Sequence, residues 1–368
     1  MKAGKLSESV LKRSVLKQLH SLTEIHAGAR QDEPEVTIVS RPEIGADYAA
    51  VKLTNAAAPA NVSSGSGSQT DTKYANAGLE LPEKSVVSTV ATRCLGGAMN
   101  PMLSVYAALN NLYCSGAKAY GIMVNLLLPT SANENELREW VQAMDAVCEK
   151  EGVAVLGGHT EVVRAVSEPM VTVTALGTVD EAQRIEAGTV KPGMDILITK
   201  QIALEGTAIL ATQHEEKLLG RYAVPFIDRA KRFTDYLSIR SEAAVAAKSG
   251  VAAMHDISEG GVFGALWEMG LSSGVGLEID LKKIPIRQET VEICEFFDIN
   301  PYKLLSGGAA VIAATDGNAL VHALQLAGIE ATIVGKATDS NDRVLINGEE
   351  RRFLETTQTD ELFKMKEN

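Results

Sequence analysis

The stretch Val153-Ala154-Val155-Leu156-Gly157-Gly158-His159-Thr160-Glu161-Val162-Val163 decides how the rest of the chain is interpreted. Its four leading apolar residues predict a short buried strand, and the glycine pair predicts a tight turn that leads into polar residues. Because glycine has no Cβ, backbone N–H groups at such a turn can approach a ligand closely and form a nest for an anion or a phosphate. The alternative is a tight turn with a polar rim and no ligand.

A second stretch has the same order of residue types. Val251 to Val262 contains an apolar strand, then acidic and hydroxyl residues, and then the glycine pair Gly260-Gly261. Two copies of one device predict two related domains that face one site.

Length, composition and charge limit the class of protein. A chain of 368 residues suits two domains, and 45% hydrophobic with 22% charged residues is typical of a globular protein. The net charge of −12 argues against a nucleic-acid or membrane partner, and a phosphate ligand would need metal ions or local lysines. No apolar run reaches the ~20 residues that span a bilayer, and residues 1–22 lack an apolar signal-peptide core, which favours a cytoplasmic protein.

The order of predicted elements gives the domain organisation. Strands alternate with helices throughout, which predicts an α/β (α+β) fold with domains over residues 1–179 and 180–348 and a polar tail over 349–368. Residues 56–80 are rich in alanine, serine, glycine and asparagine and predict a flexible insertion in the first domain. An amphipathic helix is predicted over residues 6–20.

The clearest predicted helix covers residues 134–151, whose apolar side chains share one face. Ser131 and Glu134 are predicted to form its capping box, and Gly152 its end. Another helix is predicted over Phe226–Leu237.

The four cysteines have no metal-ligand spacing and predict no disulfide framework. Cys148 and Cys294 are interpreted as small core residues, and a reactive thiol at Cys94 or Cys114 stays open.

Two aspartates are candidate magnesium ligands. Asp47 follows Gly45 between two strand-like runs, and Asp256 ends the second strand. Magnesium takes hard oxygen ligands, usually one or two carboxylates together with substrate phosphates. The alternatives are a turn residue for Asp47 and a helix N-cap for Asp256 or Ser258.

The start of the helix after Asp256 is a candidate phosphate site, because its N–H groups and its dipole favour an anion. Ser258, Gly260 and Gly261 would form it. Lys200 ends a strand just before Glu205 opens the next helix, which predicts another anion-facing turn, with surface solvation as the alternative.

In the first stretch His159 is a candidate proton carrier, with a backbone-bonded polar residue as the alternative. Thr160 is a candidate phosphate contact and Glu161 a candidate metal ligand. The sequence contains no Walker loop, Rossmann glycine fingerprint, zinc spacing or nucleophile elbow, which removes several common enzyme classes.

Five motifs follow one another in a recognisable order: Gly45-Ala46-Asp47, Asn110-Asn111-Leu112, Gly157-Gly158-His159-Thr160, His255-Asp256-Ile257-Ser258-Glu259-Gly260-Gly261 and Leu305-Ser306-Gly307-Gly308. This order resembles the aminoimidazole ribonucleotide (AIR) synthase superfamily, which is PurM-like. Within it the chain is most similar to the hydrogenase-maturation carbamoyl dehydratases (HypE) and to AIR-synthase-related proteins. The resemblance runs from Gly4 to about Val344, apart from the insertion.

The resemblance implies a homodimer in which strands of the two N-terminal domains join into a barrel. It also implies ATP with Mg2+ in a cleft between the domains and the neighbouring subunit, a small-molecule substrate and a maturation-type protein partner. ATP would phosphorylate an amide or carbonyl oxygen or a phosphate. Carried over by position, the ligand-binding residues would be Asp47 (metal), Asn111 (ATP or metal), Gly157, Gly158, His159 and Thr160 (phosphate) and Asp256 (metal).

Three departures from the family pattern bear on activity. Val90 follows Ser88-Thr89 where the pattern has an aspartate, and Asn111 stands where it has a second one. Valine cannot bind a metal ion, and an amide oxygen binds more weakly than a carboxylate. The HypE pattern also ends in a cysteine that carries the carbamoyl group, and this chain ends Lys366-Glu367-Asn368.

The sequence therefore supports three hypotheses. The first is an ATP-dependent, HypE-like enzyme with an unidentified substrate, whose catalysis consists of positioning and charge neutralisation. The second is a small-molecule kinase resembling thiamine monophosphate kinase. The third is a catalytically degenerate homodimer that serves as a scaffold or nucleotide sensor.

Overall fold

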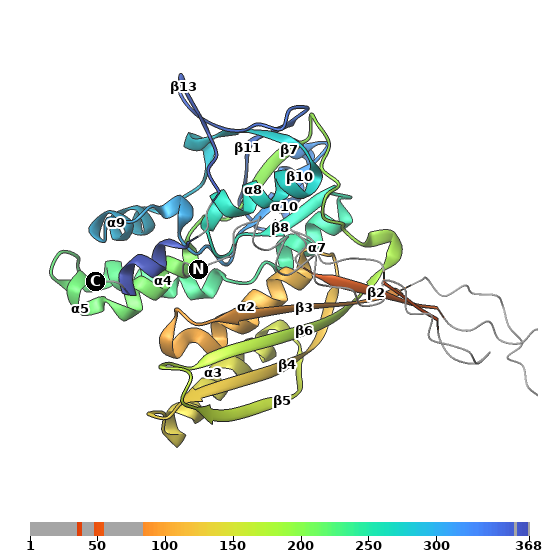
Figure 1. Cartoon of the computed structure of the whole chain (residues 1–368). Coiled ribbons are helices and arrows are strands. Elements are labelled where there is room, and N and C mark those ends of the chain that lie inside the picture. Colours follow the sequence, from red (N-terminus) through yellow and green to blue (C-terminus); the bar gives the residue numbers. More distant parts are fainter. Residues whose placement is uncertain (1–34, 39–47, 55–83, 357–358, 367–368) are drawn as a thin grey trace, which may run out of the picture.

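The computed structural model describes residues 35–38, 48–54, 84–356 and 359–366. Within these residues the chain forms two sheets with helices packed on them (Figure 1). Asp47, the 56–80 insertion and the predicted helix over 6–20 lie outside the described residues. No helix in the described part is long and apolar enough to cross a membrane. The predicted α/β class is confirmed.

The first sheet has the strand order β1-β2-β3-β6-β4-β5. Its strands are β1 Glu35–Ile38, β2 Ala49–Thr54, β3 Lys84–Arg93, β4 Lys118–Pro129, β5 Ala154–Val163 and β6 Met170–Asp180. All neighbours are antiparallel except β4 and β5, which are parallel.

Two helices, α2 (Asn100–Tyr113) and α3 (Glu134–Glu151), pack on this sheet. Alternation along β6 separates its faces, because Val171, Val173 and Ala175 are buried whereas Thr172 and Thr174 are half-buried. Among the described elements, no helix lies against the face that carries the threonines, which we call the open face.

The predicted span of α3 is confirmed, but its predicted cap was wrong. Asn133, rather than Ser131, accepts the backbone N–H groups of Asn135 (3.0 Å) and Glu136 (3.1 Å), and Glu136 closes the capping box. The helix ends at Gly152 in the left-handed conformation, as expected.

The stretch around Gly157 and Gly158 differs most from its prediction. β5 runs without a turn through both glycines and is the exposed edge strand of the described sheet, so the predicted buried strand and paired-glycine turn were wrong. Packing explains why residue 158 is glycine, because a Cβ there would lie 2.0 Å from the carbonyl oxygen of Val124 on β4.

The second sheet has the order β13-β12-β9-β11-β7-β10-β8. Its strands are β7 Asp195–Thr199, β8 Ala253–Asp256, β9 Gly276–Asp280, β10 Ala310–Ala314, β11 Ala331–Thr338, β12 Arg343–Asn347 and β13 Glu350–Phe353. The accompanying helices are α4 Leu204–Gln213, α5 Glu215–Leu219, α6 Val224–Lys231, α7 Arg240–Lys248, α8 Gly261–Ser273, α9 Gln288–Phe296 and α10 Gly317–Leu326. The helix predicted over Phe226–Leu237 is α6 followed by a 3-10 turn, Arg232–Tyr236.

The segment expected to be a polar tail takes part in the fold. β13 pairs with β12, so the second sheet continues past residue 348. Asp360 and Leu362 are buried, and a 3-10 turn covers Glu361–Lys366. The sequence pattern did not indicate this packing because only a few apolar residues of the segment are buried in the fold.

Candidate functional site

The two sheets meet where α2 lies against the end of β8 (Figure 1). With its amide nitrogen turned toward its acceptors, Asn111 of α2 donates to both carboxylate oxygens of Asp256 at 2.9 and 3.1 Å, and to the carbonyl of Ala107 at 3.2 Å. Asp256 is 2% exposed, whereas Asn111 is half-buried and is the accessible member of the pair. The structure thus brings together two residues from opposite halves of the sequence that were both predicted to bind the nucleotide or its metal. We call this place the domain boundary.

The neighbouring Asn110 has a structural role at the same boundary. Its side chain donates to the carbonyl of Leu237 at 2.8 Å and accepts the backbone N–H of Ile239 at 3.0 Å. These two bonds fasten α2 to the segment that precedes α7. Asn110 and Asn111 therefore point to different partners.

A buried arginine lies beside Asp256. Arg93, the last residue of β3, donates from Nε to Glu205 at 3.0 Å and from Nη1 to Glu259 at 3.5 Å. Glu205 stands in the first turn of α4, and Glu259 in the turn between β8 and α8. We refer to Arg93, Glu205, Asp256 and Glu259 as the boundary cluster.

Burial and charge act against each other in this cluster. Burial alone would lower the pKa of Arg93, but the carboxylates of Glu205 and Glu259 raise it above its usual value. Burial raises the pKa of Glu205, and Arg93 opposes this effect. The cluster holds three carboxyl groups and one guanidinium, and Glu205 and Glu259 depend on Arg93 for compensation of their charge.

The boundary cluster does not fit magnesium. Magnesium demands near-octahedral oxygen ligands and keeps several waters, which needs open carboxylate oxygens. Both oxygens of Asp256 face the Asn111 amide, and one oxygen of Glu205 faces Arg93. The other oxygen of Glu205 fills the position that a Cβ of Gly307 would take, at 2.1 Å. Among the residues that the structure describes, no group of three or more His, Cys, Asp or Glu side chains is arranged to hold a metal ion.

The predicted phosphate site at the start of α8 is already occupied by the chain itself. Gly260 donates its N–H to the carboxylate of Asp360 at 2.8 Å. Burial raises the pKa of Asp360 to about 6, although the backbone N–H groups that it accepts oppose the change. Neither Asp256 nor Ser258 caps the helix through its side chain, and the carboxylate of Asp360 stands where the sequence predicts a phosphate.

Gly261 follows in the left-handed conformation, with φ of 64°. A Cβ at this position would lie 2.5 Å from the carbonyl oxygen of Tyr302. The carbonyl of Ser258 accepts the N–H of Gly261 at 3.0 Å and completes the turn. Packing is therefore sufficient to explain the second glycine.

The predicted residues of β5 lie elsewhere. Figure 1 shows β5 at the edge of the first sheet that is farthest from β8. His159 and Glu161 contact each other at 3.2 Å, and both are more than half exposed. His159 pairs with Asn125 and Asn125 with Thr172, which places His159 on the open face. Within one chain, the structure does not bring His159, Thr160 or Glu161 to Asp256.

The ammonium of Lys200 is held by groups of the chain itself. Its ammonium contacts Glu242 at 2.5 Å and donates to the carbonyls of Tyr236 (2.9 Å) and Ser238 (2.6 Å). Burial lowers the pKa of Lys200, although Glu242 opposes this effect.

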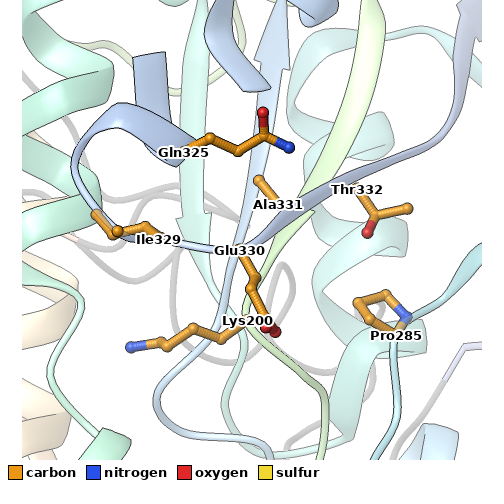
Figure 2. Close-up of a pocket in the computed structure, with 8 residues that line it drawn as sticks. Lys200, Pro285, Gln325, Ile329, Glu330, Ala331 and Thr332 are labelled. Atoms are coloured by element: carbon orange, nitrogen blue, oxygen red, sulfur yellow. The ribbon is translucent and has the colours of Figure 1, made fainter. Parts of the chain in front are cut away.

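The body of Lys200 lines a pocket of about 380 Å³ between the end of β7 and the start of β11. Figure 2 shows its side chain directed away from Pro285 and Thr332 on the opposite wall. The ammonium thus ties β7 to the segment before α7, and it leaves the pocket without this positive charge.

Sequence reasoning missed Arg93 and Asp360 and gave no role to Glu205 and Glu259. Arg93 had no local signal, since it simply ends a strand. Glu259 was visible within the His255–Gly261 motif, and Glu205 at the start of a predicted helix. A charge search at strand ends and helix starts would have found both carboxylates, although not their common partner.

Comparison with protein families matches both halves of the chain. Residues 87–179 match the N-terminal domain of AIR synthase related proteins, and residues 191–347 match the C-terminal domain. A putative hydrogenase expression/formation protein of Methanocaldococcus jannaschii is 26% identical over 281 residues, which cover 74% of this chain and 81% of the relative. The carbamoyl dehydratase HypE of Azotobacter vinelandii is 25% identical over 284 residues, with the same two coverages of 74% and 81%.

Solved structures show the same fold. HypE in complex with ATP gives a TM-score of 0.66 at 16% identity, covering 75% of this chain and 86% of that one. The HypE–HypF complex gives 0.64 at 21% identity, covering 74% and 90%. Thiamine monophosphate kinase from Aquifex aeolicus gives 0.57 at 15% identity, with the same coverages of 74% and 90%. With both domain models matched in order, the chain belongs to the AIR synthase-related proteins.

Proposed function

We propose that this chain binds ATP at the domain boundary and acts as an ATP-dependent, HypE-like enzyme on a small substrate. The observation that carries the proposal is the contact between Asn111 and Asp256, because the two halves of the family fold meet at these residues. Support comes from the relatives, since HypE proteins share the sequence pattern and one HypE structure was solved with ATP.

Charge at the boundary determines the form in which ATP would bind. ATP is a polyanion, and the boundary cluster carries three carboxyl groups against one guanidinium. Bare ATP would be repelled, so we expect the nucleotide to bring its own Mg2+ as counter-ion. Phosphoryl transfer then needs little from the protein beyond positioning and electrostatic stabilisation.

Nucleotide binding is the first testable prediction. Isothermal titration with ATP and MgCl2 is expected to show binding that EDTA abolishes. Asn111→Ala is expected to weaken it by about tenfold or more, the equivalent of one hydrogen bond to a charged group. The matched control is Asn347→Ala, which removes an exposed amide at the end of β12 and should leave the affinity unchanged. Absence of ATP binding to the folded wild-type chain would overturn the proposal.

Dimerisation is the second prediction, and the open face supports it. Val90 and Met123 both pair with Thr174, so they stand in one row across β3, β6 and β4. They are 60% and 48% exposed, as large apolar side chains on a flat sheet. We infer that a second copy of the chain covers this face, as the family resemblance implies.

A double variant, Val90→Glu with Met123→Glu, is expected to halve the mass in solution from twice 39.1 kDa to one chain. Light scattering after size exclusion measures this mass. Leu326→Glu, at a 77% exposed apolar residue of α10, is the control and should leave the dimer intact. A wild-type protein of single-chain mass would contradict the inference.

Dimerisation also determines whether residues of β5 can contribute to a nucleotide site. His159 lies on the open face, so it can reach a boundary cluster only in a second copy. If His159→Ala lowers ATP affinity in the dimer, β5 completes the neighbouring site. The solved HypE–HypF complex makes a maturation-type protein a further candidate partner.

A second candidate function, nucleotide sensing without turnover, is favoured by one observation. Val90 and Asn111 stand where the family pattern has carboxylates, and both oxygens of the retained Asp256 accept from the Asn111 amide. The release of ADP or of a phosphorylated product separates the two functions. A chain that binds ATP and releases neither product is a sensor, and an accumulating phosphorylated small molecule identifies a kinase.

A further inference from the structure

Arg93 is held at the domain boundary from several sides. Its guanidinium is 8% exposed and contacts Glu205 and Glu259, which belong to the other half of the chain. Its backbone N–H donates to the hydroxyl of Ser104 at 3.1 Å, which fixes the end of β3 against α2. Few positions in a protein bury an arginine so fully without compensating charges, and here two carboxylates contact it directly.

The turn that presents Glu205 is strained. Lys200 and Ala203 both adopt positive φ, 49° and 60°, although neither is glycine. Non-glycine residues in this conformation are strained and persist only where the surroundings fix them. The Ser306 hydroxyl accepts the N–H of Ala203 at 2.5 Å. This bond holds the turn and so helps to fix the position of Glu205 at the domain boundary.

The charge at the boundary is therefore set without a metal ion. The amide of Asn111 donates to both carboxylate oxygens of Asp256, and the positive charge of Arg93 compensates the negative charges of Glu205 and Glu259. Every carboxyl group of the boundary cluster thus has an N–H donor of the chain against it. A divalent ion at Asp256 would have to displace the Asn111 amide from both carboxylate oxygens.

We infer that Arg93 is a built-in cation that takes the place of a divalent metal ion at Asp256. Asp256, which the sequence predicts to bind magnesium, lies in this cluster, and Arg93 supplies there the positive charge that the ion would otherwise provide. This inference concerns the protein without nucleotide, so it stands or falls independently of ATP binding.

The experiment counts Mn2+ ions on the full chain without nucleotide, using electron paramagnetic resonance with Mn2+ in place of the silent Mg2+. The wild-type chain is compared with Asp256→Asn, and no ion should depend on Asp256. Arg93→Met removes the charge but keeps the length of the side chain, and it is expected to bind one additional Mn2+ per chain. Arg93→Met combined with Asp256→Asn should lose that ion.

Arg93→Lys is the matched control, because it keeps the positive charge and should gain no ion. Thermal unfolding gives a second readout. At an ion concentration near 100 times its Kd, Mg2+ should raise the Tm of Arg93→Met by roughly 5 °C while leaving the wild-type Tm nearly unchanged. If Arg93→Met does not fold, Arg93→Gln, which keeps an N–H donor toward Glu205, provides the same comparison.

Two results would overturn the inference. One is a Mn2+ ion on the wild-type chain that Asp256→Asn removes, because Asp256 would then already hold a metal. The other is a folded Arg93 variant without positive charge that binds no more Mn2+ than the wild type.

Discussion

Replacing Asn110 by alanine is expected to lower the free energy of unfolding by about 2–6 kcal/mol, because two buried backbone groups would lose their partners at roughly 1–3 kcal/mol each. Asn110 is 1% exposed, so water cannot replace the lost side chain. The groups concerned are the carbonyl of Leu237 and the N–H of Ile239, both in the segment that α2 holds at the boundary.

Asn133→Ala is the matched control. Asn133 also bonds two backbone groups, the N–H groups of Asn135 and Glu136, but these bonds are exposed. Loss of an exposed N-cap costs about 1 kcal/mol, since water takes over the N–H groups. Guanidinium unfolding of both variants compares the two. Equal costs would show that Asn110 does not fasten the two halves of the chain.

The second large effect is expected at the glycine pair before α8. Gly261→Ala should cost about 3–5 kcal/mol, because the new Cβ would lie 2.5 Å from the carbonyl oxygen of Tyr302 and 2.9 Å from the backbone of Leu304. Neither neighbour is the flexible end of a side chain. The backbone of α8 or of the segment after Asn300 would have to move.

The other end of the same helix supplies the control. Gly274 has nearly the same φ, 65° against 64° for Gly261, but a Cβ there would meet no atom within 4 Å. Gly274→Ala therefore isolates the cost of the left-handed conformation, about 1–2 kcal/mol. Thermal and denaturant unfolding measure both changes. If the two variants lose the same stability, crowding against Tyr302 is not what selects glycine at 261.

Periodicity in the sequence predicted most of the elements. The apolar face of α3 follows from local residues, and its predicted span is confirmed. Prediction was wrong at β5, because Val153 to Leu156 has the apolar content of a buried strand. Which strand lies at the edge depends on pairing, and pairing involves residues that are far apart in the sequence.

The boundary shows the same limit. Asp256 and Asn111 were found through motifs, but Arg93 was not, because its partners lie 112 and 166 positions away. No local sequence pattern distinguishes an arginine that ends a strand with its side chain in solvent from one whose side chain is buried among carboxylates. The meaning of the glycines also depended on distant atoms, as Gly158 and Gly261 are each required by a backbone carbonyl of another segment.

The bond between Asp360 and Gly260 has a practical consequence for work on this protein. The segment that contains Asp360 and the 3-10 turn Glu361–Lys366 is hydrogen-bonded to the start of α8, beside the boundary cluster. An affinity handle fused after this segment, or trimming by a protease, would disturb the very region where nucleotide is to be measured.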